Sequence, residues 1–114
     1  VNHPDMPDHD SHNIAKKYMP KGAGSIITFG VKGGRDAGKA FIENVKLASH
    51  LANVGDAKTL IIHPATTTHS RIDAEALVAA GITEDMIRIS VGIENVNDIT
   101  QDFNNGLRVA KKFI

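Results

Sequence analysis

One arginine in this sequence stands inside an apolar stretch. Arg88 lies between Ile87 and Ile89, in a segment whose alternation is typical of a half-buried strand. A guanidinium in such a setting needs an anion, and its planar fork matches a carboxylate or a phosphate with two parallel hydrogen bonds. Either a bound ligand supplies that anion, or Arg88 pairs with an acid such as Glu94 or is exposed on an open sheet face. The residues alone favour the second, structural interpretation.

Three other groups of residues have types that can do chemistry, and a structural role suits each of them better. The six histidines form no closed ligand set at a metal-binding spacing. The glycine-rich stretch at 30–34 matches neither the Walker pattern nor the dinucleotide fingerprint, so we expect a tight turn. The Thr/Ser run at 66–70 has no nucleophile elbow around it. Its hydroxyls are therefore expected to bond the backbone of their own loop.

The elements that must position these residues alternate along the chain. Runs of β-branched and apolar residues predict strands at 25–31, 59–62 and 87–91. Helical spacing predicts helices at 35–48, 73–80 and 96–113, and Ser11 is a candidate N-cap for a short helix within residues 1–23. Prolines and glycines punctuate that first segment, which we expect to form an arm. The alternation predicts a small sheet covered by helices, with one side functional or solvated.

Length and composition limit the function further. A chain of 114 residues makes about one domain. Its 13 basic residues balance 13 acidic ones without clustering, which argues against nucleic-acid and membrane-surface binding. The lack of cysteine excludes thiolate metal sites and cysteine nucleophiles and, with no signal peptide or membrane span, suggests a cytoplasmic protein. Because the chain starts at Val1 rather than Met, we expect a cut end.

Three segments, in this order, resemble one enzyme family. They are SIITFGVKGG at 25–34, LIIHPATTTHS at 60–70 and IRISVGIE at 87–94. The family is the Cys/Met-metabolism enzymes that depend on pyridoxal 5′-phosphate (PLP). Residues 15–24 and 47–57 are most similar to its O-acetylhomoserine sulfhydrylase branch. Cystathionine synthases and lyases usually carry Ser-Leu-Gly where this chain has Asn53, Val54 and Gly55.

The resemblance covers nearly the whole chain and implies a fold. This fold is α+β, an α/β sandwich in which helices cover a small, mostly antiparallel sheet, and it is the C-terminal small domain of the PLP-dependent transferase (aspartate aminotransferase-like) fold. Residues 1–114 would form this single domain, with 1–23 as an entering arm and short helix. The Schiff-base lysine and the other PLP-binding groups would belong to a large domain that is absent here. Neither Lys32 nor Lys58 lies in a Schiff-base motif, so the chain alone is expected to be inactive.

The resemblance also implies an activity in methionine biosynthesis for the whole enzyme. PLP would serve as the electron sink while O-acetyl-L-homoserine loses acetate and sulfide or methanethiol adds, giving homocysteine or methionine. Arg88 would grip the substrate α-carboxylate, Thr68 would orient the guanidinium, and the backbone or side chain of Asn53 would meet the same carboxylate. This implication reverses the preference for a structural Arg88. A homo-oligomer is implied for the full-length enzyme. The alternatives are cystathionine γ-synthase, methionine γ-lyase and a non-catalytic interaction module.

Overall fold

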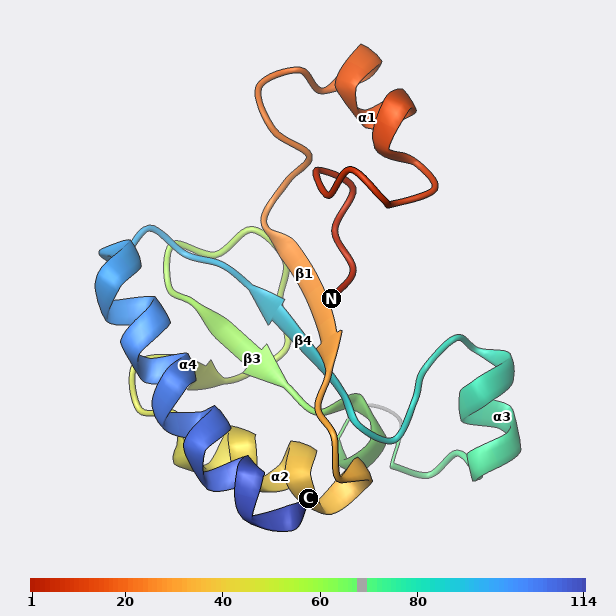
Figure 1. Ribbon diagram of the computed structural model, residues 1–114, viewed down its shortest axis with the longest axis vertical. Helices are drawn as coiled ribbons and strands as arrows, with labels where there is room; N and C mark the ends of the chain where they lie inside the picture. The colour runs from red at the N-terminus through yellow and green to blue at the C-terminus, as the bar shows by residue number, and fades with distance from the viewer. Residues whose placement is uncertain (68–69) are drawn as a thin grey trace.

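The computed structural model describes residues 1–67 and 70–114, which form a four-stranded sheet, helices against it and an arm (Figure 1). The elements in chain order are α1 (His12–Tyr18), β1 (Ile26–Gly30), α2 (Gly34–Asn44), β2 (Ser49–His50), β3 (Leu60–Ile62), the 3-10 helix η1 (Pro64–Thr66), α3 (Ala74–Ala79), β4 (Met86–Ser90), α4 (Val96–Ala110) and the 3-10 helix η2 (Lys111–Phe113). No helix in this described part of the chain is long and apolar enough to cross a membrane.

The sheet has the strand order β1-β4-β3-β2. Strand β4 is antiparallel to both of its neighbours, β1 and β3, while β2 pairs with β3 in parallel. The prediction of a small, mostly antiparallel sheet covered by helices is therefore confirmed. Figure 1 shows α2 and α4 side by side against the sheet, α3 at one corner, and the arm with α1 standing away from the end of β1.

The pairing register divides the sheet residues between two faces, because successive side chains in a strand point to opposite sides. One face carries the row Ile27, Ile89 and Ile61, which packs into the core with Phe41 of α2 and Ala110 of α4. The Phe41 ring meets Phe29 edge-on at 5.4 Å between centroids and Phe103 of α4 at 6.0 Å. These contacts fix how the helices sit on the sheet.

The opposite face carries the chemistry that the sequence singled out. Arg88 lies there between Thr28 of β1 and Ile62 of β3, and Ser90 follows it two residues along β4. The loop at 51–58 lies over this face, since Arg88 bonds Asn53 and Ser90 bonds Gly55. The Arg88 face also carries the buried residues Leu60, Ile62 and Ser90, so it is not a solvated face.

One local prediction is wrong in detail. The helix expected at 35–48 ends at Asn44, because Asp102 of α4 accepts hydrogen bonds from the backbone N–H groups of Lys46 and Ala48 and so holds the chain in a non-helical path. That path leads into β2, a strand that the sequence pattern did not predict. Ser11 does occupy the N-cap position of α1, but its side chain makes no capping hydrogen bond.

Close helix packing depends on a glycine in α4. A Cβ added to Gly106 would stand 3.0 Å from the Phe41 ring and from a methyl of Val45, which is tighter than ordinary side-chain contact. Any larger residue would push α4 away from α2. The glycine therefore sets the separation of the helices that close the core.

Candidate functional site

Arg88 is half-buried, and its guanidinium makes one hydrogen bond to the described residues. Nη2 donates to the backbone carbonyl of Asn53 at 3.0 Å. The ion pairs found among residues 1–67 and 70–114 do not include Arg88. No acceptor within those ranges takes a hydrogen bond from Nε or Nη1. Among the described residues, the guanidinium is thus held from one side, through Nη2.

The expected alternative partner of Arg88 is engaged elsewhere. The Glu94 carboxylate accepts hydrogen bonds from the backbone N–H of Thr59 at 2.9 Å and from its hydroxyl at 2.9 Å. It forms no ion pair with Arg88, so the interpretation in which Glu94 neutralises this arginine is wrong. Within the described residues, the charge of Arg88 is not compensated by a carboxylate.

Asn53 meets Arg88 through its backbone and not through its side chain. Its Oδ1 accepts from the N–H of Val54 at 2.8 Å, and its Nδ2 donates to Asp56 at 3.3 Å. Both contacts lie within the loop 51–58, which leaves the carbonyl oxygen to face Arg88. The structure therefore brings two of the three predicted site residues together, and it shows which part of Asn53 is involved.

The third predicted residue, Thr68, lies outside the described residues, as does His69. The part of the same loop that is described supports the expected structural role of its hydroxyls. Thr66 and Thr67 both donate to the backbone carbonyl of His63, at 3.3 Å and 2.8 Å. These bonds close the 3-10 turn that leads toward Thr68.

His63 is a structural residue that sequence reasoning placed only beside a loop. It is fully buried, with Nδ1 3.0 Å from the Thr66 hydroxyl and Nε2 against the backbone carbonyl of Glu84. Because a carbonyl can only accept, Nε2 carries a proton. His63 thus ties η1 to the turn before β4. Its position directly before Pro64 gave no sign of this burial.

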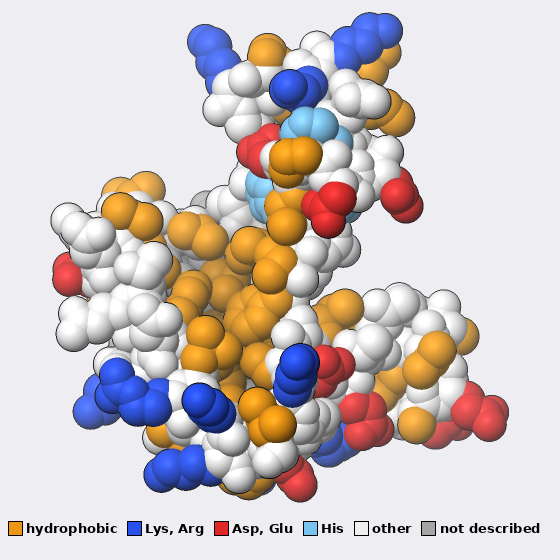
Figure 2. Space-filling model, viewed as in Figure 1, with side chains coloured by type: hydrophobic (Ala, Val, Ile, Leu, Met, Phe, Trp, Pro, Cys, Tyr) orange, Lys and Arg blue, Asp and Glu red, His pale blue; other side chains and the backbone are white. Residues whose placement is uncertain are grey.

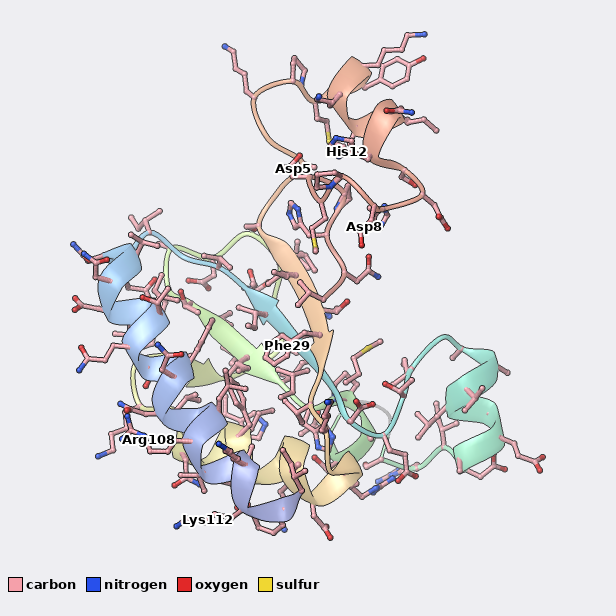
Figure 3. The ribbon with its side chains drawn as sticks, in the orientation of Figure 1. Asp5, Asp8, His12, Phe29, Arg108 and Lys112 are labelled. Atoms are coloured by element: carbon pink, nitrogen blue, oxygen red, sulfur yellow. The ribbon has the colours of Figure 1, made fainter. Side chains whose placement is uncertain are left out.

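His12 and the glycine turn both make structural contacts. Figure 3 shows His12 close to Asp5 in the arm, where its Nδ1 bonds the carbonyl of Pro4 at 2.9 Å. No group of three metal-binding side chains occurs within residues 1–67 and 70–114. Gly33 adopts a φ of 105°, and a Cβ there would stand 2.8 Å from the carbonyl oxygen of Phe113. The stretch at 30–34 is therefore a tight turn packed against the C-terminal end.

The residues of this chain do not fit a PLP-holding site. Every lysine in the chain is exposed, including Lys32 and Lys58, whereas a lysine that forms a Schiff base has to lie in a shielded pocket for its amine to be held over the ring. All buried side-chain polar atoms in the described part of the chain already have hydrogen-bond partners. The cofactor's phosphate and ring nitrogen would therefore find no unpaired buried side-chain donor among these residues.

One apolar groove lies open beside the sheet. Hydrophobic side chains gather between α4 and β1 in Figure 2, where Phe29, Val31 and Leu107 help to line a groove of about 430 Å³. Charged residues lie on the outer side of the C-terminal helices, where Arg108 of α4 and Lys112 of η2 point away from the sheet (Figure 3). The groove is unlike the ordinary surface of a small domain, which carries scattered apolar residues.

Comparison with known proteins gives closely similar enzymes. The chain is 50% identical over 110 residues to a homocysteine synthase of Schizosaccharomyces pombe, covering 96% of this chain and 26% of that protein. It is 49% identical over 107 residues to O-acetyl-L-homoserine sulfhydrylase 1 of Thermus thermophilus, covering 94% and 25%. The chain thus spans about a quarter of the length of these curated relatives.

Solved structures agree in fold. A cystathionine gamma synthase of Xanthomonas oryzae pv. oryzae in complex with cystathionine matches with a TM-score of 0.86 and 34% identity, covering 100% of this chain and 30% of that one. A Campylobacter jejuni chain described as an O-acetylhomoserine (thiol)-lyase with a pyridoxyl-lysine matches with a TM-score of 0.85 and 37% identity, covering 94% and 25%. The expected fold is confirmed. The family model described as Cys/Met metabolism PLP-dependent enzyme matches residues 1–108, and the chain belongs to that PLP-dependent family.

Proposed function

We propose that this chain is the substrate-carboxylate-binding domain of an O-acetyl-L-homoserine sulfhydrylase. The whole enzyme would replace the acetate of O-acetyl-L-homoserine by sulfide or methanethiol and so form homocysteine or methionine. The observation that carries the proposal is Arg88, a half-buried cation that Asn53 orients and that no carboxylate among the described residues neutralises. The relatives named homocysteine synthase and O-acetyl-L-homoserine sulfhydrylase support the choice of reaction.

The chemistry of Arg88 suits the α-carboxylate of an amino acid. A guanidinium can hold both oxygens of a carboxylate with parallel, charge-assisted hydrogen bonds, which fixes the direction of the bound molecule as well as its place. The Asn53 carbonyl occupies one Nη2 hydrogen and so limits rotation of the fork. In the proposed enzyme, this orientation sets which bond of the substrate Cα faces the reacting centre held by the rest of the protein. Thr68 would help to orient the same guanidinium.

We further propose that residues 1–114 are the C-terminal small domain and that residues 1–23 are the arm through which the chain enters it. The coverage of about a quarter of each relative supports this, as does the open apolar groove between α4 and β1. A large PLP-binding domain would be the partner, and the full-length enzyme would be a homo-oligomer. The intact mass of the natural product and the reading frame upstream of Val1 test this. A natural product that begins near Val1, with no PLP-binding partner encoded, would favour a non-catalytic interaction module.

The Arg88 assignment is tested by ligand titration of the full-length enzyme. L-norvaline carries an α-carboxylate, and n-butylamine is the same molecule without it. Replacing Arg88 by Ala is expected to weaken L-norvaline binding by about 30-fold or more, because losing one partner of a shielded charge pair costs roughly 2 kcal/mol or more. Binding of n-butylamine should not change.

Arg108 provides the matched control, since it is an exposed arginine on the outer side of α4. Arg108→Ala should leave both ligands and the PLP absorbance unchanged. If Arg88→Ala instead binds L-norvaline normally, or loses the PLP absorbance band, the carboxylate role is wrong.

A cystathionine γ-synthase is the second candidate, supported by the structural match to the Xanthomonas oryzae enzyme. The two candidates differ in the nucleophile and not in the Arg88 contact. Turnover of an activated homoserine with sulfide but not with L-cysteine would support the sulfhydrylase. The opposite preference would support the synthase.

A further inference from the structure

The loop 51–58 is the part of the molecule that brings a backbone carbonyl to Arg88, so its placement decides how the guanidinium is oriented. Two hydrogen bonds hold this loop over the sheet. The Asn53 carbonyl accepts from the Arg88 guanidinium, and the N–H of Gly55 donates to the Ser90 hydroxyl at 3.3 Å. Both contacts are single hydrogen bonds near the surface. By themselves they are too weak to fix a loop of this length against its conformational entropy.

Thr59, the residue after the loop, makes the hydrogen bonds that hold the end of the loop in place. It has no exposed surface, and its carbonyl accepts from the N–H of Ser49 at 3.0 Å, which joins the two ends of the loop. Its hydroxyl accepts from the N–H of Gly92 at 2.9 Å. Thr59 thus links three separate segments.

Glu94 is the charged group that holds this junction. Its carboxylate takes both the backbone N–H and the hydroxyl of Thr59, 35 residues earlier in the chain. Hydrogen bonds to an ionised acceptor are about twice as strong as neutral ones. Desolvation by burial acts to raise the pKa of Glu94, but hydrogen bonds from Thr59 and from its own backbone, together with nearby Lys58, lower it below its ordinary value.

The turn that carries Glu94 has little freedom to shift. The N–H of Ile93 donates to the carbonyl of Ala57 at 2.9 Å. A Cβ added to Gly92 would overlap the backbone of Ala57 and of Thr59, so these two segments already lie in backbone contact. Movement of the Glu94 turn would therefore carry the end of the loop with it.

We propose that Glu94 is a positioning residue for the Arg88 site, because its carboxylate fixes Thr59 and thereby holds the loop 51–58 where the Asn53 carbonyl orients the guanidinium. This inference rests on the proposed carboxylate-binding function. The Glu94 carboxylate is bonded to Thr59 and forms no ion pair with Arg88. Glu94 thus acts on the ligand only through other residues.

The experiment compares Glu94→Ala with Glu94→Gln in the full-length enzyme. Glutamine keeps one oxygen that can accept from Thr59, and alanine keeps none. Glu43→Ala removes an exposed glutamate on α2 that pairs with Lys39, and it serves as the control. Four quantities are measured for each variant: the dissociation constants of L-norvaline and of n-butylamine, the exchange rate of the Gly55 amide hydrogen, and the melting temperature.

We expect Glu94→Ala to weaken L-norvaline binding by about tenfold, since small misplacements of orienting groups cost up to ~100-fold. The Gly55 amide should exchange faster, while n-butylamine binding stays unchanged. Glu94→Gln should bind L-norvaline within about twofold of the parent, because its amide oxygen still accepts from Thr59. Glu43→Ala should match the parent.

Unchanged L-norvaline binding in Glu94→Ala would overturn the proposal, and so would equal losses for both ligands or for both Glu94 variants. Should Glu94→Ala fail to fold, Thr59→Val removes only the hydroxyl of the junction, and it should weaken L-norvaline binding selectively. Arg88→Ala is run in parallel. If Arg88→Ala has no effect, the proposed function fails; if only the Glu94 variants have no effect, this inference alone fails.

Discussion

The two faces of the sheet are held by different kinds of contact. On the face under α2 and α4, the rings of Phe29, Phe41 and Phe103 and the isoleucines of three strands make a continuous apolar core. On the other face, a loop is seated over Arg88 and Ser90 by single hydrogen bonds. Apolar burial gives most of the stability of a domain, whereas oriented polar groups give specificity. Stability and ligand binding should therefore respond to different substitutions.

The largest effect is expected on the apolar face. Phe41 is fully buried at the centre of the aromatic contacts, and Phe41→Ala should lower the free energy of unfolding by about 3–5 kcal/mol, because it leaves a cavity as well as losing buried surface. Urea denaturation of this chain measures the change. L-norvaline affinity per folded molecule should remain that of the parent in the full-length enzyme. A loss of affinity at low urea would show that the two faces are coupled.

Replacing Asp102 is expected to lower stability less than Phe41→Ala does. It should also affect both faces of the sheet. Its carboxylate is buried and accepts from Lys46 N at 2.6 Å and from Ala48 N at 3.0 Å, on the chain that leads into β2 and the loop. Asp102→Asn places an amide N–H against one of these donors and should cost roughly 1–3 kcal/mol. It should also speed exchange of the Gly55 amide.

The control for Asp102 is Asp98→Asn, which removes an exposed carboxylate from the first turn of the same helix. It should cost no more than about 0.5 kcal/mol, through the helix dipole. Equal effects of the two substitutions would mean that the contact between α4 and residues 46–48 contributes little.

The smallest expected effect is the pH dependence of the stability that Glu94 contributes. Because the pKa of Glu94 is lowered in the folded chain, its contribution to stability is fully present above the ordinary value of 4.5 and is lost as the pH falls through the folded-state pKa. The stability difference between the parent and Glu94→Gln should be constant near neutral pH and should shrink in acid. Denaturation at several pH values measures it. A difference that grows in acid would contradict the sign.

Local patterns in the sequence were sufficient to predict the main strands and the face of the sheet on which Arg88 lies. The alternation around residue 88 placed the arginine on the face away from the apolar core, and the run at 25–31 predicted β1. Family resemblance was needed to give Arg88 a ligand, and the ligand-binding roles of Arg88 and Asn53 stay predictions.

Local sequence patterns could not predict contacts between residues that are far apart in the chain. Strand β2 has only two residues, Ser49 and His50, and it depends on bonds from Asp102 to the preceding chain. Glu94 was a candidate partner for Arg88 because the two are near in sequence. In the structure it instead accepts a hydrogen bond from Thr59, which lies 35 residues earlier. The burial of His63 depends on Glu84, which lies 21 residues further on.

The late position of Asp102 in the sequence also affects the order in which parts of the fold can form during synthesis. It bonds Lys46 and Ala48, which lie 56 and 54 residues earlier, and α4 begins only at Val96. During synthesis, the strand bearing Arg88 leaves the ribosome before the residue that fixes the path into the loop above it. The proposed Arg88 site is therefore assembled only when α4 closes over a sheet whose strands have already been made.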